Sequence, residues 1–238
     1  MSQPAPQFPP LFHGHEVARG ADPFAAARDA AAQGCEAGLV TYGGAAGRLE
    51  AALVLAPDVP LGEAAAMLPV AGIGFQNALG ALSPPEVAVH LEWAGAIRIN
   101  GARCGGLRLW SDTREAEAIP GWLVIGLTLD ILPQSPDQGG EDPDRTALHA
   151  EGCGDVDPLA LLEAWIRHSY LWLSRWDAGE VRAVHDQWTG LLHGLSETVT
   201  QSGRSGTFLG IDERFAMLLR DAERTHSIPL TELLEEAT

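Results

Sequence analysis

The side chains that could hold a metal ion or act as a nucleophile are a histidine pair and three cysteines. His13 and His15 are separated by one glycine. Zinc requires three or four converging ligands, and we expect no metal site from this pair alone. The thiols of Cys35, Cys104 and Cys153 are odd in number and widely spaced, so they match neither a disulfide framework nor a CxxC metal pair. Reduced cysteines in a cytosolic protein fit this pattern.

The cationic chemistry of the chain rests on arginine alone, because the sequence holds fifteen arginines and no lysine. The absence of lysine excludes a Schiff base, a phosphate-binding GK[ST] loop and an ammonium on a transferring phosphoryl group. Arginine binds phosphates and carboxylates through its bidentate fork. Arg48, Arg98, Arg103 and Arg108 are therefore the candidate ligands for an anionic group.

Composition indicates a globular protein of one large domain with a small appendix. The 238 residues are 46% hydrophobic and 20% charged. A net charge of −17 at pH 7 argues against nucleic-acid and anionic-membrane partners, which require a cationic surface. No apolar run approaches the roughly 18 residues of a membrane span, and the first residues lack a secretory signal. We expect a cytoplasmic protein.

Hydrophobic periodicity predicts alternating helices and strands that end in a small β appendix. A helix over 24–33 has Asp22 as its N-cap, and Asn100-Gly101 is a strong signal for a β-hairpin. The tail from Thr207, about 35 residues, falls below the size that usually folds alone, and we expect it to lean on the main domain. Further strands are predicted over 37–42, 49–56, 87–93, 96–99, 104–110 and 122–132, with helices over 60–82, 162–176 and 181–195.

Two segments, His90-Leu-Glu-Trp-Ala-Gly-Ala-Ile-Arg-Ile-Asn-Gly-Ala-Arg-Cys-Gly-Gly-Leu-Arg-Leu109 and Leu123-Val-Ile-Gly-Leu-Thr-Leu-Asp130, resemble the biotin protein ligases. The signature of that family is a strand ending K-W-P-N-D, a hairpin I-x-x-N/D-G-x-K, then A-G-I-L and a later V-I-G-x-G-I-N. Trp93 falls on the family tryptophan and Asn100-Gly101 on the hairpin turn. Gly106 and Gly126 fall on glycines of the two later motifs.

The resemblance extends over about residues 12–235. It includes Ala147–Gly152, the helix from Ala178 to Trp188, and Gly206–Asp212 with Met217–Leu219 of a small C-terminal domain. It implies an α+β fold of the biotin/lipoate protein ligase type, which is class II synthetase-like, with a mixed β-sheet flanked by helices. A ligase-like domain over 1–198 and a small SH3-like domain over 199–238 follow from it.

Departures from the signature bear on activity. The family lysine that contacts the acid substrate and the phosphate of the acyl-adenylate corresponds to Glu92, and a carboxylate there would repel developing phosphate charge. Pro-Asn-Asp becomes Ala94-Gly95-Ala96. The arginine-rich ligand loop of the family shrinks to Gly43–Arg48. The second glycine and the asparagine of the later strand become Thr128 and Asp130.

The resemblance therefore implies a biotin protein ligase-like pseudoenzyme that binds a small molecule and does not adenylate biotin by the usual mechanism. Two alternatives stay open: an active biotin/lipoate-type ligase or acyltransferase with altered chemistry, in which Cys104 could accept an acyl group, and a non-catalytic interaction module. A small carboxylic acid, a carrier-domain protein and a second copy of the chain are the candidate partners. Biotin, lipoate or octanoate and ATP are the ligands implied, with no catalytic residue assigned. The pocket candidates are Arg48, Glu92, Trp93, Gly105, Gly106, Arg108 and Gly126.

Overall fold

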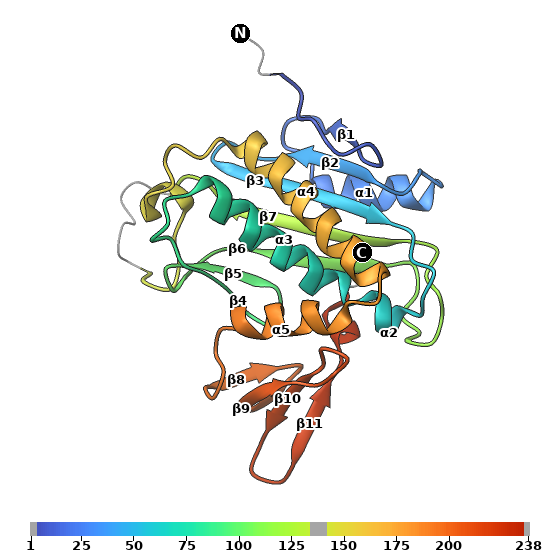
Figure 1. The fold of residues 1–238 in the computed structure, drawn as a ribbon, viewed down its shortest axis with the longest axis vertical. Helices are drawn as coiled ribbons and strands as arrows, with labels where there is room; N and C mark the ends of the chain where they lie inside the picture. Colours follow the sequence, from blue (N-terminus) through green and yellow to red (C-terminus); the bar gives the residue numbers. More distant parts are fainter. Residues whose placement is uncertain (1–3, 134–141, 236–238) are drawn as a thin grey trace.

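A seven-stranded mixed sheet forms the centre of the computed structural model, which describes residues 4–133 and 142–235 (Figure 1). The strand order is β1-β2-β3-β7-β6-β5-β4. Only the β1–β2 pair is parallel among these described strands, and the other neighbours are antiparallel. The strands are β1 (His13–Glu16), β2 (Leu39–Gly43), β3 (Arg48–Leu55), β4 (Val89–Leu91), β5 (Ala96–Ile99), β6 (Ala102–Ser111) and β7 (Leu123–Asp130).

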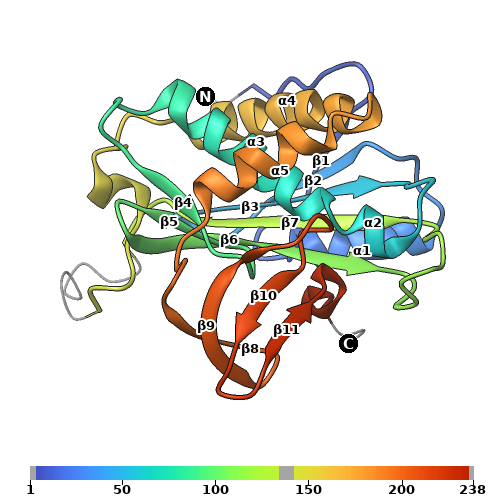
Figure 2. The ribbon, with the colours of Figure 1, turned by 60° about the horizontal axis from the view of Figure 1, so that its bottom comes forward.

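Helices cover the two faces of this sheet unequally (Figures 1 and 2). Three of them, α3 (Met67–Leu82), α4 (Pro158–Asp177) and α5 (Val181–Leu191), pack on one face and enclose the larger apolar core. A single helix, α1 (Pro23–Ala32), lies on the other face over a smaller core. Part of that second face is therefore not covered by a helix. The whole second face is called the α1 face below.

Local sequence signals explain where the helices begin. The Asp22 side chain accepts the amide of Phe24 at 2.8 Å, and Pro23 occupies the first turn of α1. Asp157 caps α4 in the same way, ahead of Pro158. In α3, Gly74 lies against Ser169 of α4, where a Cβ atom would collide. The Asp157 cap and the Gly74–Ser169 approach position the helices on the larger core, and the Asp22 cap fixes the start of α1 on the other face.

The stretch Leu61–Leu82 is long and apolar enough to cross a membrane by length and composition. It comprises α2 (Leu61–Ala64) and α3, and 72% of its most apolar window is buried inside the fold. That burial is typical of a core helix. The sequence predicted one helix over 60–82, but the structure has two, because the helix is interrupted between Ala64 and Met67.

A second, four-stranded antiparallel sheet in the order β11-β10-β9-β8 ends the chain (Figure 2). Its strands are β8 (Thr198–Gln201), β9 (Arg204–Ile211), β10 (Met217–Arg220) and β11 (Thr225–Ile228), followed by the 3-10 turn Leu230–Leu233. Phe208 of β9 and Phe215 of the connection between β9 and β10 join the same apolar core as α3 and α4. The small sheet therefore leans on the main domain, and its form is consistent with the SH3-like appendage expected from the sequence.

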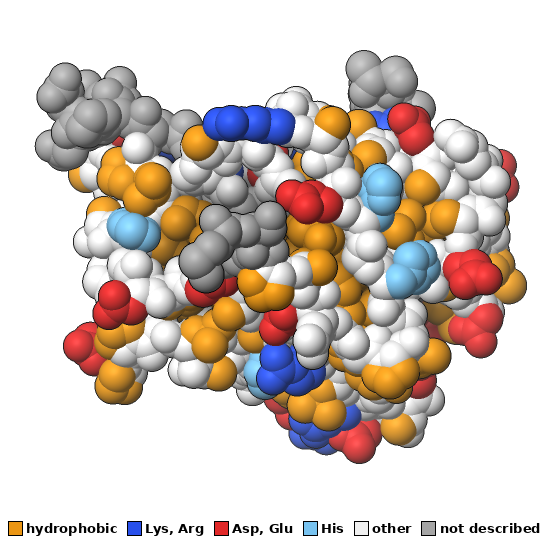
Figure 3. All heavy atoms as spheres, turned by 90° about the horizontal axis from the view of Figure 1, so that it is seen from above, with side chains coloured by type: hydrophobic (Ala, Val, Ile, Leu, Met, Phe, Trp, Pro, Cys, Tyr) orange, Lys and Arg blue, Asp and Glu red, His pale blue; other side chains and the backbone are white. Residues whose placement is uncertain are grey.

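The structure confirms the α+β class and the mixed sheet flanked by helices. Asn100 and Gly101 both have positive φ, as the expected two-residue hairpin requires. The segment around His13 and His15, for which no helix or strand was predicted, forms an exposed edge strand. Strands β8 and β11 were not predicted, because they are short and lack a marked alternation of apolar residues. On the face shown in Figure 3, the basic side chains are few and scattered.

Candidate ligand-binding site

Strand alternation places most candidate residues of β3, β6 and β7 on the α1 face, whereas Gly105 faces the opposite side. Ala52 and Val124 pack against Phe24 of α1 in the smaller core, and side chains two residues apart share a face. Glu50 on β3 and Thr128 on β7 therefore face the same side as α1. The register aligns Glu50, Thr128, Gly106 and Ala96 side by side across four strands. This set is called the exposed row.

The exposed row consists of half-buried residues, three of them small. A Cβ atom built on Gly106 would meet only backbone atoms of Gly95 and Ala96, at 3.4 Å and beyond. None of the three atoms nearest to that position belongs to a side chain. The row is thus the part of the α1 face where a ligand could lie directly on the sheet.

The adjacent row is closed by α1. A Cβ on Gly126 would lie 2.5 Å from the ring of Phe24, whose exposure is 2%. The Arg108 guanidinium lies 4.2 Å from the centroid of that ring, and its Nη2 lies 3.2 Å from Asp22 Oδ1. Gly126 and Arg108 are therefore engaged by the start of α1.

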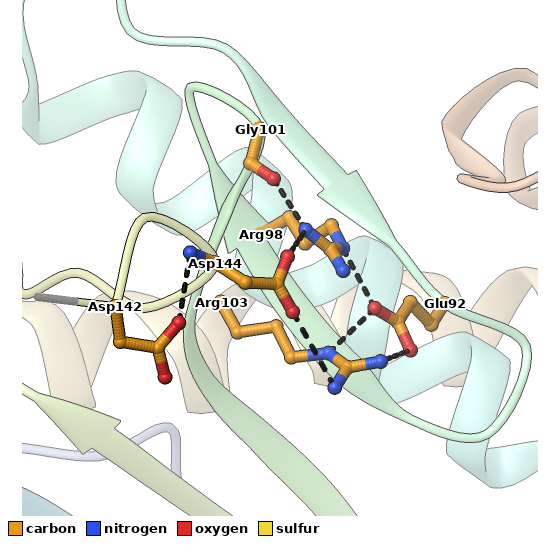
Figure 4. A network of polar contacts seen from close by, with 6 residues as sticks. All are labelled: Glu92, Arg98, Gly101, Arg103, Asp142 and Asp144. Carbon is orange, nitrogen blue, oxygen red and sulfur yellow. Dashed lines mark hydrogen bonds and ion pairs between the residues drawn. The ribbon is translucent and has the colours of Figure 1, made fainter.

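A cluster of ion pairs surrounds Glu92 (Figure 4). Arg103 donates from Nε and Nη2 to the two carboxylate oxygens of Glu92, both at 2.8 Å. Arg98 donates from Nε to Glu92 Oε1 at 2.6 Å and from Nη1 to Asp144 Oδ1 at 2.7 Å. The Arg103 Nη1 lies 3.6 Å from Asp144 Oδ2. Two carboxylates and two guanidiniums thus form one compact network.

Electrostatics keep Glu92 ionised. Burial alone would raise the pKa of Glu92, but the hydrogen bonds and charges of Arg103 and Arg98 outweigh it and hold the pKa below its usual value. Burial would likewise lower the pKa of Arg98, yet Asp144 and Glu92 raise it. The side chains of Arg98 and Glu92 are 9% and 20% exposed. The four side chains are therefore each ionised, and the net charge of the network is zero.

Arg48 has a carboxylate partner of its own on the neighbouring strand. Its Nε donates to Asp130 Oδ1 at 2.7 Å, and its Nη1 lies 3.9 Å from Glu50 Oε1. Arg145 approaches Asp130 from the loop after β7, at 3.8 Å. An open hollow of about 470 Å³ lies beside Arg48 and is bordered by Leu132 and other residues of the 131–132 and 149–158 segments.

Trp93 and Gly105 are held by structural contacts. The indole of Trp93 is 1% exposed and donates to the carbonyl oxygen of Phe215 at 2.8 Å, which links the main domain to the small sheet. A Cβ on Gly105 would collide with the carbonyl oxygen of Thr128. These contacts account for both residue types without a ligand.

The structure therefore distributes the candidate residues over distinct places. Glu92 belongs to the ionic network, Gly106 to the exposed row, and Arg108 and Gly126 to the zone under α1. Arg48 pairs with β7. Two further participants, Phe24 and Asp144, were missed, because their contacts join segments far apart in the sequence and leave no local pattern.

The Cys104 thiol is fully buried and donates to the carbonyl oxygen of Asp130 at 3.4 Å. Burial, with the nearby charge of Asp130, raises its pKa to about 12. It therefore stays protonated at neutral pH. Within residues 4–133 and 142–235, no group of three or more His, Cys, Asp or Glu side chains could hold a metal ion.

Comparison with known proteins establishes the family. Residues 8–190 match the biotin/lipoate A/B protein ligase family, and residues 195–236 match a domain family of unknown function. The chain therefore belongs to the biotin/lipoate A/B protein ligase family. No match was found among curated protein sequences.

Solved structures agree with this assignment. A biotin protein ligase-like protein of unknown function from Silicibacter sp. TM1040 is 56% identical, with 98% of this chain and 100% of that chain covered and a TM-score of 0.91. The biotin protein ligase of Aquifex aeolicus in complex with biotin and ATP is 15% identical, with coverages of 91% and 95% and a TM-score of 0.70. The Leishmania major ligase in complex with biotinyl-5-AMP is 18% identical, with coverages of 92% and 99% and a TM-score of 0.57. At such identities the two ligases show the shared fold.

Proposed function

We propose that this protein is a biotin protein ligase-like pseudoenzyme that binds a small carboxylic acid and does not adenylate it by the usual lysine-dependent mechanism. The observation that carries the proposal is the ion-paired carboxylate of Glu92. Glu92 corresponds to the position at which the ligase signature has lysine. The carboxylate is fixed there by Arg98 and Arg103 and kept ionised.

Electrostatics make this arrangement unsuited to adenylation. Attack of a carboxylate on the α-phosphate of ATP brings anionic groups together and builds up negative charge, which an enzyme stabilises with cations placed in advance. The two arginines nearest Glu92 already neutralise Glu92 and Asp144. A phosphate placed there would meet a fixed negative charge and guanidiniums that are already paired.

Space for a ligand remains on the exposed row. Three members of the row, Thr128, Gly106 and Ala96, offer a surface on which a small molecule could lie close to the backbone. The fourth, Glu50, has its carboxylate 3.9 Å from the Arg48 guanidinium, so a bound acid would lie over the three small residues. Phe24 bounds the row on one side. Biotin and ATP are the first ligands to test because related folds have been solved with them, and lipoate and octanoate follow from the family.

The burial of Cys104 disfavours acyl transfer through its thiol. A thiol that is fully buried, with a pKa raised to about 12, supplies almost no thiolate at neutral pH. An acyltransferase activity would therefore require a nucleophile other than Cys104.

Calorimetric titration of the full chain with biotin, lipoate, octanoate and ATP tests binding. We expect at least one of the acids to bind, and Gly106→Val to abolish that binding by filling the exposed row. Gly190→Val, at an exposed position of α5 with no described atom within 4 Å of a Cβ, is the matched control. Failure of every acid to bind, or equal binding by the Gly106 variant, would contradict the proposed site. Pyrophosphate exchange tests adenylation separately.

A further inference from the structure

An open groove of about 840 Å³ lies on the opposite side of the sheet from the exposed row. It is found where the last turns of α4 approach α2 and the end of β3 (Figure 1). Aromatic side chains of Phe12, Tyr170 and Trp176 line it together with aliphatic ones. Its volume falls within the range of ligand pockets, which bury apolar molecules against such linings.

Three carboxylates, those of Asp58, Glu63 and Asp177, also line the groove, and no Arg or His is among its lining residues. All three residues are exposed. None of these carboxylates makes an ion pair or a side-chain hydrogen bond with any residue in the part of the chain that the structure describes. The nearby Arg175 is directed elsewhere, since it pairs with Glu180 and stacks on Trp172.

Two of these like charges lie close enough to affect each other. Burial, and then the charge of Asp58, raise the pKa of Asp177. The groove also receives the C-terminal end of α4, a helix of 20 residues whose macrodipole is negative at that end. The groove therefore combines an apolar, aromatic interior with uncompensated negative potential.

We propose that this groove binds a small organic ammonium compound, one that carries a cationic nitrogen on an apolar or aromatic body. Charge complementarity selects this occupant over a carboxylic acid or a neutral molecule. The ammonium would donate to Asp58 and Asp177, and the apolar body would lie against Tyr170 and Trp176. Aromatic faces also attract cations directly, which adds to the preference for an ammonium group. This site is separate from the exposed row and does not depend on the function proposed for it.

Matched probes test the proposal on the full chain. 2-Phenylethylammonium, 2-phenylethanol and 3-phenylpropionate have similar apolar bodies and differ in charge. We expect the ammonium to bind by calorimetry and to shift the indole N–H resonance of Trp176 in a nitrogen-15 correlation spectrum. We expect the alcohol to bind at least about fivefold more weakly, and the carboxylate not to bind.

Charge-neutralising variants locate the interaction. Asp58→Asn and Asp177→Asn should each weaken binding of the ammonium about fivefold, the upper end for an exposed ion pair, and together about twentyfold. Neither side chain has a partner among the described residues, so we expect both variants to fold. Glu86→Gln is the matched control, an exposed carboxylate beyond the far end of α3, and should leave the affinity unchanged.

Three results would overturn the proposal. The first is binding of 2-phenylethanol as tight as that of the ammonium, because charge would then play no part. The second is unchanged affinity in the Asp58→Asn/Asp177→Asn double variant. The third is the absence of any Trp176 shift at millimolar ammonium in the folded wild-type protein.

Discussion

Replacing Glu92 with glutamine removes the negative centre of the ionic network while keeping the shape of the side chain. Arg103 loses a two-pronged contact and Arg98 loses a bond of 2.6 Å, and both guanidiniums are left facing each other across a neutral amide. Truncating one partner of a fully buried pair costs about 3–5 kcal/mol, and an exposed pair is worth at most about 1 kcal/mol. Glu92 is 20% exposed, so we expect a loss of about 2–3 kcal/mol.

Urea unfolding at pH 7 measures this loss, and thermal unfolding should show a drop of about 5–10 °C for a chain of this length. Glu86→Gln, which removes an exposed carboxylate without a described partner, should change stability by less than about 0.5 kcal/mol. A double-mutant cycle with Arg103→Gln should give a coupling energy of about 1 kcal/mol or more.

The pH dependence gives a second check on the same variant. The pKa of Glu92 is lowered in the folded protein, so its stabilising effect is complete above its unfolded value of about 4.3 and is lost as pH falls through the folded value. The difference between wild type and Glu92→Gln should stay constant from pH 5 to 8 and narrow progressively as pH falls below about 4.3. A loss no larger than that of Glu86→Gln, or a difference that does not narrow between pH 5 and pH 3, would refute the reasoning.

Three further experiments test the contacts described above. Trp93→Phe should cost about 1–2 kcal/mol, because its indole bond to the small sheet is buried, and should speed hydrogen exchange over residues 198–235; unchanged exchange would argue against that link. Gly105→Ala should destabilise by about 3 kcal/mol or more in urea, whereas Gly106→Ala should cost less than about 1 kcal/mol, because only the first Cβ collides with backbone; equal losses would contradict this contrast. Iodoacetamide at pH 8 should label the partly exposed Cys35 and leave Cys104 unmodified in the native protein, as mass spectrometry would reveal; rapid labelling of Cys104 would disprove its burial.

Much of the fold could be predicted from the sequence because its signals are local. The cap at Asp22 and the positive-φ pair Asn100-Gly101 follow from short-range chemistry, and the structure confirms both. The edge strand at His13–Glu16 lacked such a signal, since it is short, fully exposed and stabilised by pairing with Leu39–Gly43. The interruption of the helix after Ala64 likewise had no local signal, because it lies within a continuous apolar run.

The candidate site was harder to predict because it depends on contacts across long sequence separations. Glu92 could be identified as a departure from the ligase signature, but not its pairing with Arg98 and Arg103, which depends on the register of β4, β5 and β6. Phe24 carries no local signal of its role, because that role depends on α1 lying over Gly126. A Glu92→Lys substitution therefore would not simply restore a ligase site, because the new ammonium would face both arginines.

Pyrophosphate exchange is the measurement that tests the central claim most directly. The protein is incubated with ATP, magnesium, labelled pyrophosphate and each of biotin, lipoate and octanoate, with the Aquifex aeolicus biotin ligase and biotin as the positive control. In the function proposed above, Glu92 places a fixed negative charge where the reacting phosphate needs a free cation, so we predict no exchange above the acid-free background with any acid. Acid-dependent exchange by the wild-type protein would contradict the account.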